Sequence, residues 1–363
     1  MTVRETYLAW MRYALWGGNP PDLPVDDEVL ALADRQKTRG LIIDALLRNP
    51  GQTGAQRAKD WQQFLFQTFN THRMLDAALI RAVKVLRDAG IPAVLLKGQG
   101  VARNYPNPLL RECGDIDLYI GPDRLDDAVR ALTPLADRVI PETDRKHRTL
   151  WIGEAKFELH RESMTPTSRR QACFYHSLET EGLSNGLFPL DFDGVRVDTP
   201  ECTFNALFLF YHAWDHFLSG GIGLRQLCDW ALLLHAQQAR IDRDRLGAML
   251  DGMRLRRAWQ LFGCIAVQDL GLPQESFPFY DGRRLRMSRR VLQRILAEGN
   301  FGEGRGLRSE RPKTYLADKA YWLGVHFRRF LETVRIAPRD AWQTFREQIA
   351  IAIRHTRKDL FRL

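Results

Sequence analysis

Residues 114–120 read GDIDLYI, so that two carboxylates alternate with large apolar residues directly after a turn glycine. Side chains of a strand point to alternate faces, which predicts a strand with Asp115 and Asp117 on one face and the apolar residues on the other. Two aspartates side by side repel each other unless a cation lies between them. Hard divalent ions such as Mg²⁺ take carboxylate oxygens as ligands and also bind polyphosphates. The stretch therefore predicts a metal-binding strand.

The segment before this strand predicts a phosphate-binding turn. Residues 93–96 read as a short apolar strand that leads into Lys97 and Gly98 and then into a short helix. A glycine at a helix start leaves backbone N–H groups open, because no side chain blocks the approach of a phosphate. Arg111, four residues before the first aspartate, is a candidate clamp on phosphate or ribose.

The segment after the strand supplies a third acid. Residues 148–152 and 156–160 predict a hairpin with its turn at Gly153. The alternation in its second strand places Glu158 and His160 on one face. This strand can pair beside the strand that carries the aspartates, which would bring three carboxylates together.

Composition bounds the class of protein. The chain has 363 residues, of which 45% are hydrophobic and 27% are charged, as expected of a globular protein with two or three domains. It contains neither an apolar stretch that predicts a membrane-spanning helix nor a clear signal peptide, so the cytoplasm is the expected location. The five cysteines form no CxxC pair, which argues against a disulfide framework or a zinc cluster.

The net charge of +9 is concentrated in the last third of the chain. Residues 251–363 hold 23 Lys and Arg against 12 Asp and Glu, which leaves residues 1–250 with a net charge of −2. Arginine clusters at 283–290 and 354–362 predict attraction of phosphate, nucleic acid or an acidic membrane face, although a solvated helix face is the simpler interpretation.

Three regions differ in their periodicity. Residues 1–90 are predicted to be mostly helical, residues 91–200 form a mixed region of strands and helices, and residues 201–363 are helical and basic in the last third. Helices in the third region are predicted at 201–218, 224–237, 242–270, 285–298, 313–333 and 338–359.

Taken together, these motifs resemble the uncharacterised nucleotidyltransferase family of the polymerase-beta-like superfamily. The resemblance spans about residues 75–240 and includes a helical part with His212 and His216 followed by residues 223–229. It implies an α+β fold: a small mixed-sheet polymerase-beta-like nucleotidyltransferase core flanked by N-terminal helices and a C-terminal helical domain. Lys97 and Gly98 stand where the superfamily has a Gly-Gly or Gly-Ser pair, which is a departure from the pattern.

The resemblance implies a reaction and roles for the site residues. A nucleoside monophosphate is moved from a nucleoside triphosphate such as ATP to a hydroxyl acceptor, with release of pyrophosphate. Two Mg²⁺ or Mn²⁺ ions are expected. Asp115, Asp117 and Glu158 are the expected metal ligands and catalytic residues. The expected nucleotide-binding residues are Lys97, Gly98, Arg111 and Gly114. His160 is expected to orient Glu158 or to contact the acceptor.

Three residues of the helical part allow more than one interpretation of their role. His212 and His216 lie one helical turn apart, a spacing that suits zinc, but no Glu follows His212 and no third ligand is apparent, which favours histidines of the core or of the active-site wall. Asp229 either pairs with Arg225 at helical spacing or reaches the cleft.

The acceptor has no signature in the sequence. A small molecule, a sugar, a peptide or protein, and RNA all stay open, and the basic last third keeps nucleic acid as a possible partner. Three other functions compete with the enzyme: a nucleotide-binding regulator without turnover, a nucleic-acid-binding module that uses the C-terminal arginines, and a membrane-surface protein anchored by residues 338–359 without membrane insertion.

Overall fold

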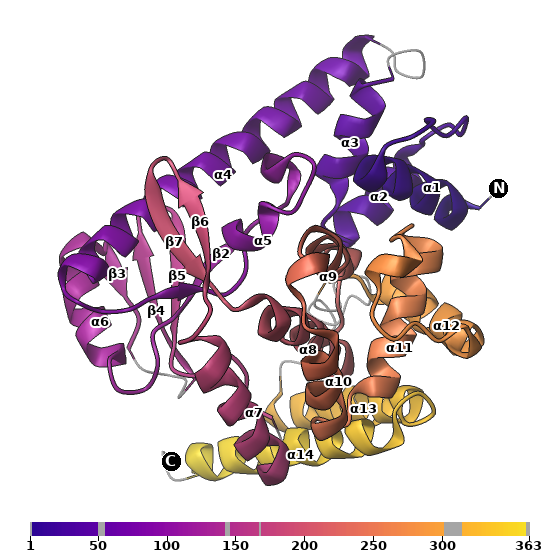
Figure 1. The fold of residues 1–363 in the computed structure, drawn as a ribbon. Helices are drawn as coiled ribbons and strands as arrows, with labels where there is room; N and C mark the ends of the chain where they lie inside the picture. The colour runs from indigo at the N-terminus through magenta and orange to yellow at the C-terminus, as the bar shows by residue number, and fades with distance from the viewer. Residues whose placement is uncertain (1, 50–54, 142–145, 167, 301–313, 361–363) are drawn as a thin grey trace.

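The computed structural model describes residues 2–49, 55–141, 146–166, 168–300 and 314–360 and is built around one mixed sheet (Figure 1). The seven strands follow the order β3-β4-β5-β2-β1-β7-β6. The bounds of the strands are β1 Val94–Leu95, β2 Asp115–Tyr119, β3 Arg138–Val139, β4 His147–Ile152, β5 Ala155–His160, β6 Phe188–Phe192 and β7 Val195–Thr199. The mixed sheet and its flanking helices confirm the α+β fold expected from the sequence.

Strands β2 and β5 are parallel neighbours, as the sequence suggested. Their register places Asp115 opposite Lys156 and Asp117 opposite Glu158. The apolar residues that alternate with the acids of β2, Ile116 and Leu118, are fully buried on the opposite face of the sheet. The pairing therefore gathers the acids of two strands on one face.

The apolar face of the sheet is covered by α4 and α6. Helix α4 (Ala55–Asp88) is 34 residues long, and its part from Leu75 onward lies on the sheet, with α6 (Leu125–Leu132) beside it (Figure 1). Leucine and valine side chains recur along α4 at helical spacing and join the apolar residues of β2 and β5 in one core cluster. The face with the acids is thereby turned toward the other helices.

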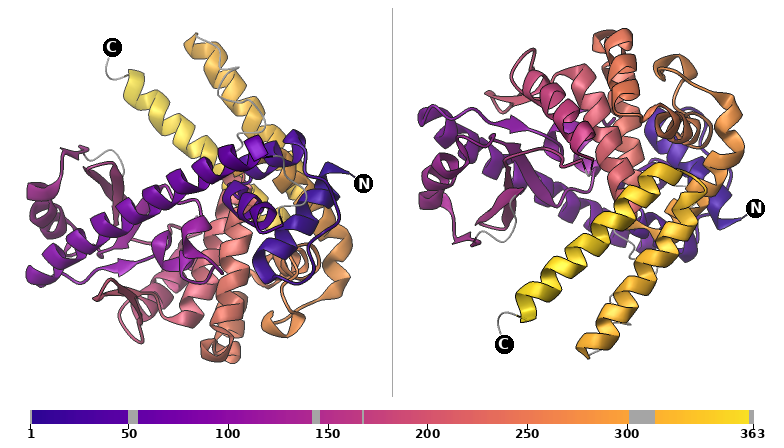
Figure 2. Two further views of the ribbon diagram at one scale, coloured as in Figure 1. Left: turned by 90° about the horizontal axis from the view of Figure 1, so that it is seen from above. Right: turned by 90° about the horizontal axis from the view of Figure 1, so that it is seen from below.

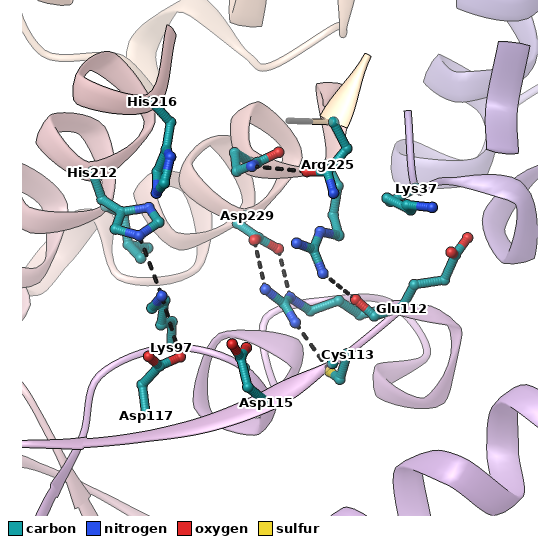
Figure 3. Close-up of a pocket in the computed structure, with 16 residues that line it drawn as sticks. Lys37, Lys97, Glu112, Cys113, Asp115, Asp117, His212, His216, Arg225 and Asp229 are labelled. Carbon is teal, nitrogen blue, oxygen red and sulfur yellow. Dashed lines mark hydrogen bonds and ion pairs between the residues drawn. The ribbon is translucent and has the colours of Figure 1, made fainter. Parts of the chain in front are cut away.

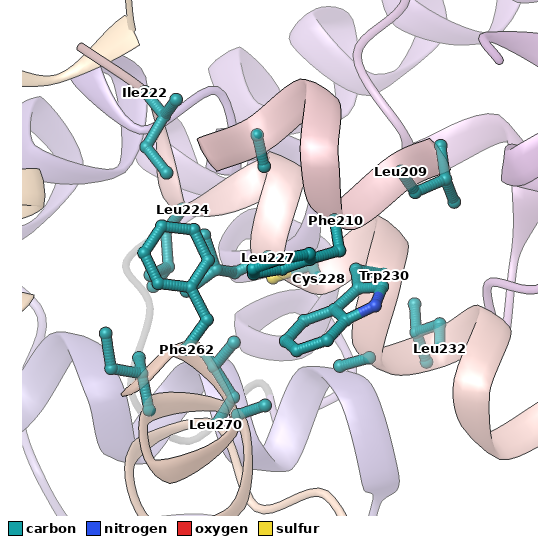
Figure 4. Close-up of a cluster of buried hydrophobic side chains, with 14 of the residues drawn as sticks. Leu209, Phe210, Ile222, Leu224, Leu227, Cys228, Trp230, Leu232, Phe262 and Leu270 are labelled. Carbon is teal, nitrogen blue, oxygen red and sulfur yellow. The ribbon is translucent and has the colours of Figure 1, made fainter. Parts of the chain in front are cut away.

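Helices from both ends of the chain form a second body around a shared core. The N-terminal helices are α1 (Val3–Trp16), α2 (Asp27–Arg35) and α3 (Arg39–Leu47), and the later ones are α8 (Cys202–Ser219), α9 (Leu224–Ala236), α10 (Arg243–Gly252), α11 (Arg256–Cys264) and α12 (Leu285–Glu298). Aromatic and aliphatic side chains of α8, α9 and α11 interlock in this core (Figure 4). The indole N–H of Trp16 donates to the carbonyl of Leu270 at 2.6 Å and ties the two ends together.

The prediction of a single helix over 242–270 is wrong. Helix α10 ends at Gly252 and α11 begins at Arg256, because Arg254 has a left-handed backbone with φ of 58° and the N–H of Leu255 turns back to the carbonyl of Leu250. A π-helix over Ile265–Asp269 then continues α11. Helix α7 (Arg169–Gly182) and the β6–β7 hairpin were not expected from the sequence.

The last two helices form a hairpin that projects from the rest of the molecule (Figure 2). Helices α13 (Tyr315–Val334) and α14 (Pro338–Leu360) pack through aromatic rings, with Phe330 and Phe345 centroids 5.0 Å apart. The side chains of the arginine cluster at 354–362 lie outside the described residues. None of the helices in the described ranges has the length and apolarity needed to cross a membrane.

Candidate active site

A glycine turn joins β1 to the short helix α5 (Gln99–Ala102) and lies against the start of β2. Gly98 has a φ of 64°, and a Cβ atom there would lie 3.2 Å from the carbonyl oxygen of Asp115. Glycine adopts this backbone without strain, and it leaves room for the close approach of the two segments. The N–H of Leu96 donates to the carbonyl of Asp117 at 3.0 Å, which fixes Lys97 beside the acids.

Asp117 is the most buried acid of the site, with 1% of its surface exposed. The Nζ atom of Lys97 lies 3.2 Å from Oδ2, and His160 Nε2 lies 2.9 Å from Oδ1. Burial by itself would raise the pKa of Asp117, but Lys97 and then His160 hold that pKa well below its usual range. Asp117 is therefore a carboxylate at neutral pH.

Asp115 projects from the same face of β2 and is more exposed. Burial, and then the charge of Asp117, raise the pKa of Asp115 above its usual range. Lys156 Nζ lies 4.0 Å from its Oδ2 atom. A cation shared by the two aspartates would remove this repulsion.

Glu158 reaches the same group of acids from β5. Burial would raise the pKa of Glu158, but a hydrogen bond from Lys156 lowers it overall. Ligand atoms of Asp117, Glu158 and His160 lie within 4.8 Å of one another, and within the described ranges this is the one such cluster of three metal-ligating side chains. The structure thus places Glu158 beside Asp117, and His160 of β5 contacts both carboxylates.

A cavity of about 400 Å³ opens between the sheet and the helices (Figure 3). On the sheet side it is lined by Lys97, Gly98, Gly114, Asp115 and Asp117, all five of them residues that the sequence had singled out. Glu158 and His160 are not in its lining, since they lie on β5 beside Asp117. The cavity is the natural place for a substrate next to the two aspartates.

The two histidines of α8 line the helical side of this cavity. Lys97 Nζ lies 3.2 Å from His212 Nε2, so one ammonium group bridges Asp117 and His212. Burial, and then Lys97, hold the pKa of His212 well below its usual range, and the same two causes lower that of His216 to about 4. Both rings are neutral at pH 7. Among the described residues, neither histidine belongs to a cluster of three metal-ligating side chains.

Arg111 and Asp229 form a buried ion pair at the back of the cavity. Arg111 Nε and Nη2 donate to the two carboxylate oxygens of Asp229 at 2.7 and 2.8 Å, and Tyr105 donates to the same carboxylate at 2.7 Å. Burial would raise the pKa of Asp229, but Arg111 holds it below its usual range. Asp229 thus reaches the cavity and is bonded to Arg111, not to its helical neighbour Arg225.

Several lining residues were not expected from the sequence. Lys37 comes from the turn between α2 and α3, Glu112 and Cys113 from the segment before β2, and Asn300 from the end of α12. Arg225 and Gln226 belong to the 223–229 segment that carried part of the resemblance, and this was the one available signal for them.

Comparison with known proteins gives one match. The family model described as "Uncharacterised nucleotidyltransferase" covers residues 25–271. This range includes α2, the whole sheet and the helices α8 to α11, which together supply nearly all of the cavity lining. No curated protein and no solved structure matches the chain.

Proposed function

The chain belongs to the uncharacterised nucleotidyltransferase family, and from that premise we propose that it transfers a nucleoside monophosphate to a hydroxyl acceptor with the help of a divalent metal. As a nucleotidyltransferase it is an enzyme that transfers a phosphorus-containing group. The observation that carries the proposal is the register of β2 against β5, which sets Asp117 opposite Glu158 and leaves Asp115 two residues away at the same cavity.

The donor set suits a hard divalent cation. Asp115, Asp117 and Glu158 offer carboxylate oxygens, which Mg²⁺ and Mn²⁺ prefer over nitrogen or sulfur. Asp117 Oδ2 is buried and accepts no hydrogen bond from any described residue, although Lys97 is close. These three residues would hold the metal. When bound, the metal would stabilise the negative charge that develops on the attacking and leaving oxygens of the displacement.

The residues of the chain supply orientation and proton transfer. The acceptor oxygen forms a bond to the α-phosphorus, the bond from that phosphorus to the bridging oxygen breaks, and pyrophosphate leaves with the electron pair. We assign the uptake of the hydroxyl proton to the carboxylate of Glu158. His160 orients Asp117 through its Nε2 contact, and Lys97 supplies positive charge where Gly98 and Gly114 let phosphate oxygens approach the backbone.

The nature of the acceptor stays part of the proposal. A small molecule, a sugar, a peptide or protein, and RNA are all compatible with a cavity of this size. One observation supports RNA as the acceptor. The last third of the chain is basic, and arginines such as Arg286, Arg289 and Arg290 cluster on α12.

The test is release of pyrophosphate from each of the four nucleoside triphosphates with Mg²⁺ or Mn²⁺, after a thermal-shift screen for the nucleotide that binds, since a ligand of the folded state raises stability. Asp115→Asn should abolish release. Asp123→Asn, an exposed acid beyond β2, is the matched control and should keep it. Binding of a triphosphate without any release would favour a nucleotide-binding regulator and contradict the enzyme proposal.

A further inference from the structure

The hairpin of α13 and α14 carries most of the large apolar side chains that the described part of the chain exposes. Five such side chains are exposed in the described ranges, and four of them lie on this hairpin. Apolar side chains that gather on a surface mark an interaction site. We name these four the apolar strip: Leu323, Phe327 and Leu331 of α13, with exposed fractions of 48%, 50% and 50%, and Trp342 of α14, with 51%.

The apolar strip is part of the packing between the two helices. Leu323, Phe327 and Leu331 recur every four residues, which sets them on one side of α13. The ring centroid of Phe327 lies 6.1 Å from that of Phe345, and the ring centroid of Trp342 lies 5.5 Å from that of Phe330. The rings are therefore held on one side by the facing helix and open to solvent on the other.

Arginines flank the apolar strip on both helices. Leu331 has an exposed arginine three residues before it and another four residues after it, and Trp342 has a pair at the same two spacings. Residues at these spacings are neighbours on a helix surface. The four arginines are Arg328 and Arg335 on α13 and Arg339 and Arg346 on α14.

The acids that the structure describes on the hairpin are only partly exposed. Asp340 accepts from the indole N–H of Trp214 at 3.3 Å, and Glu332 lies 3.9 Å from Arg294 Nε. Glu347 is half-buried as well. Where side chains of the hairpin are described, every exposed charged residue is an arginine. The surface around the apolar strip is thus positive and complements an anionic one.

A cavity of about 620 Å³ opens beside the apolar strip, where α12 meets α13. Leu331 belongs to both. In the cavity wall, the side chain of Arg294 is 9% exposed and donates from Nε to Glu298 at 2.6 Å, while its Nη1 and Nη2 atoms donate to no acceptor in the described ranges. Buried donors of this kind suit a phosphate group. The other arginines of the lining are Arg290, Arg328 and Arg335.

A bilayer surface fits this combination better than a nucleic acid does. Leucine, phenylalanine and tryptophan beside arginines are typical of helices that lie in the interface of anionic membranes. Leu323 and Leu331 have no ring on which a base could stack, whereas surfaces that bind single strands are aromatic. The hairpin also extends beyond the rest of the molecule in both views of Figure 2, which leaves it room to reach a flat surface.

We propose that the α13–α14 hairpin binds the surface of a membrane that contains anionic phospholipids. The apolar strip enters the boundary between headgroups and acyl chains, the flanking arginines contact phosphate groups, and the cavity beside Leu331 receives a headgroup. This inference goes beyond the proposed function and does not depend on it, since the strip and its arginines lie outside the lining of the active-site cavity.

The experiment measures sedimentation of the full chain with vesicles of phosphatidylcholine alone and of phosphatidylcholine and phosphatidylglycerol in equal parts. Binding should be about tenfold or more tighter to the anionic vesicles. Phe327→Gln removes apolar area that enters the bilayer, and Arg335→Gln removes one charge near its surface. Each should weaken binding to the anionic vesicles about fivefold.

Two matched controls lie outside the hairpin. Phe66→Gln changes the other exposed large apolar residue, on α4, and Arg257→Gln changes an exposed arginine of α11. Both should bind the vesicles like the wild type. All four variants change exposed side chains, so their melting temperatures should equal that of the wild type.

Several results would overturn the proposal. One is a wild type that does not bind the anionic vesicles, and another is a wild type that binds them no better than Phe327→Gln does. Binding of single-stranded RNA that Arg335→Gln weakens, without binding of vesicles, would assign the surface to RNA. A wild-type dimer in sedimentation velocity that Phe327→Gln converts to a monomer, again without binding of vesicles, would assign the apolar strip to a second copy of the chain. Pyrophosphate release without vesicles should be the same in all variants, so that a failure of the proposed function is seen separately.

Discussion

The two sides of the cavity are built by different means. On the sheet side, Asp115, Asp117 and Glu158 are neighbours because a ladder of backbone hydrogen bonds fixes β2 against β5. On the helical side, Lys37 and Arg225 are neighbours because one buried side chain, Gln36, holds three segments together. A register fixed by many backbone bonds tolerates side-chain changes, whereas a single buried anchor does not. We therefore expect changes on the sheet side to affect chemistry and changes on the helical side to affect folding as well.

The largest effect should come from Asp117→Asn. The variant keeps the shape of the side chain but removes the charge that would hold a metal, so turnover should fall about 10³-fold, equivalent to about 4 kcal/mol of transition-state stabilisation. Initial rates of pyrophosphate release give the measurement, and circular dichroism checks that the variant keeps the secondary-structure content of the wild type. Full activity in this variant would show that the Asp117 carboxylate is not needed for the reaction.

On the helical side, Asp229→Asn should act on stability instead. It leaves the guanidinium of Arg111 buried without its charge partner, and breaking a buried pair of this kind costs about 3 kcal/mol of unfolding free energy. Urea denaturation measures it. Asp251→Asn, which breaks a surface pair with Arg256, is the control and should cost under about 1 kcal/mol. Equal costs for the two variants would mean that the buried pair is not a structural element.

The pH dependence of the unfolding free energy should report on His216, a residue of the helical side. The pKa of His216 is lowered to about 4, so the unfolded chain takes up its proton at higher pH than the folded chain. The contribution of His216 is fully present above about pH 6.5 and is lost as the pH falls toward 4. Because the ring is partly exposed, we expect on the order of 1 kcal/mol. In His216→Gln the unfolding free energy should change less between pH 4 and 6.5 than in the wild type. The same pH dependence in both proteins would show that the folded chain does not hold the ring neutral.

A stability effect of similar, small size should come from the turn beside the acids. Gly98→Ala places a methyl group 3.2 Å from the carbonyl of Asp115 in a left-handed backbone, which costs about 1–2 kcal/mol of unfolding free energy. Thermal melting with Gly114→Ala as the control gives the comparison, because a Cβ at Gly114 meets no described atom within 4 Å. A smaller cost at Gly98 than at Gly114 would contradict the close packing of the turn against β2.

The sheet side could be predicted from the sequence because its information is local. Alternation of acids and apolar residues fixed the face of Asp115 and Asp117, and the same alternation in 156–160 fixed that of Glu158. The β6–β7 hairpin carries a local signal of the same kind, because Asp193 and Gly194 both have positive φ and form the Asp-Gly turn that favours a two-residue hairpin.

The helical side could not be predicted because its contacts join distant residues. Lys37 and Asn300 line one cavity although they come from opposite ends of the chain, and no spacing pattern connects them. Arg111 could be placed near the nucleotide, but its ion pair with Asp229 depends on the packing of α9 against α5, the short helix that follows β1. At the break beside Arg254, Gln171 Nε2 of α7 donates to the carbonyl of Met253 at 2.8 Å, a contact between distant residues that helix periodicity does not encode.

The central claim is that the acids of β2 and β5 hold divalent metal for nucleotidyl transfer. Its most direct test is a titration of the wild-type protein with Mn²⁺ in the presence of a non-hydrolysable nucleoside triphosphate, followed by electron paramagnetic resonance. We expect two bound ions per chain in the wild type and loss of both from Asp117→Asn, while Asp123→Asn binds them like the wild type. Equal Mn²⁺ binding by wild type and Asp117→Asn, or none by either, would contradict the account.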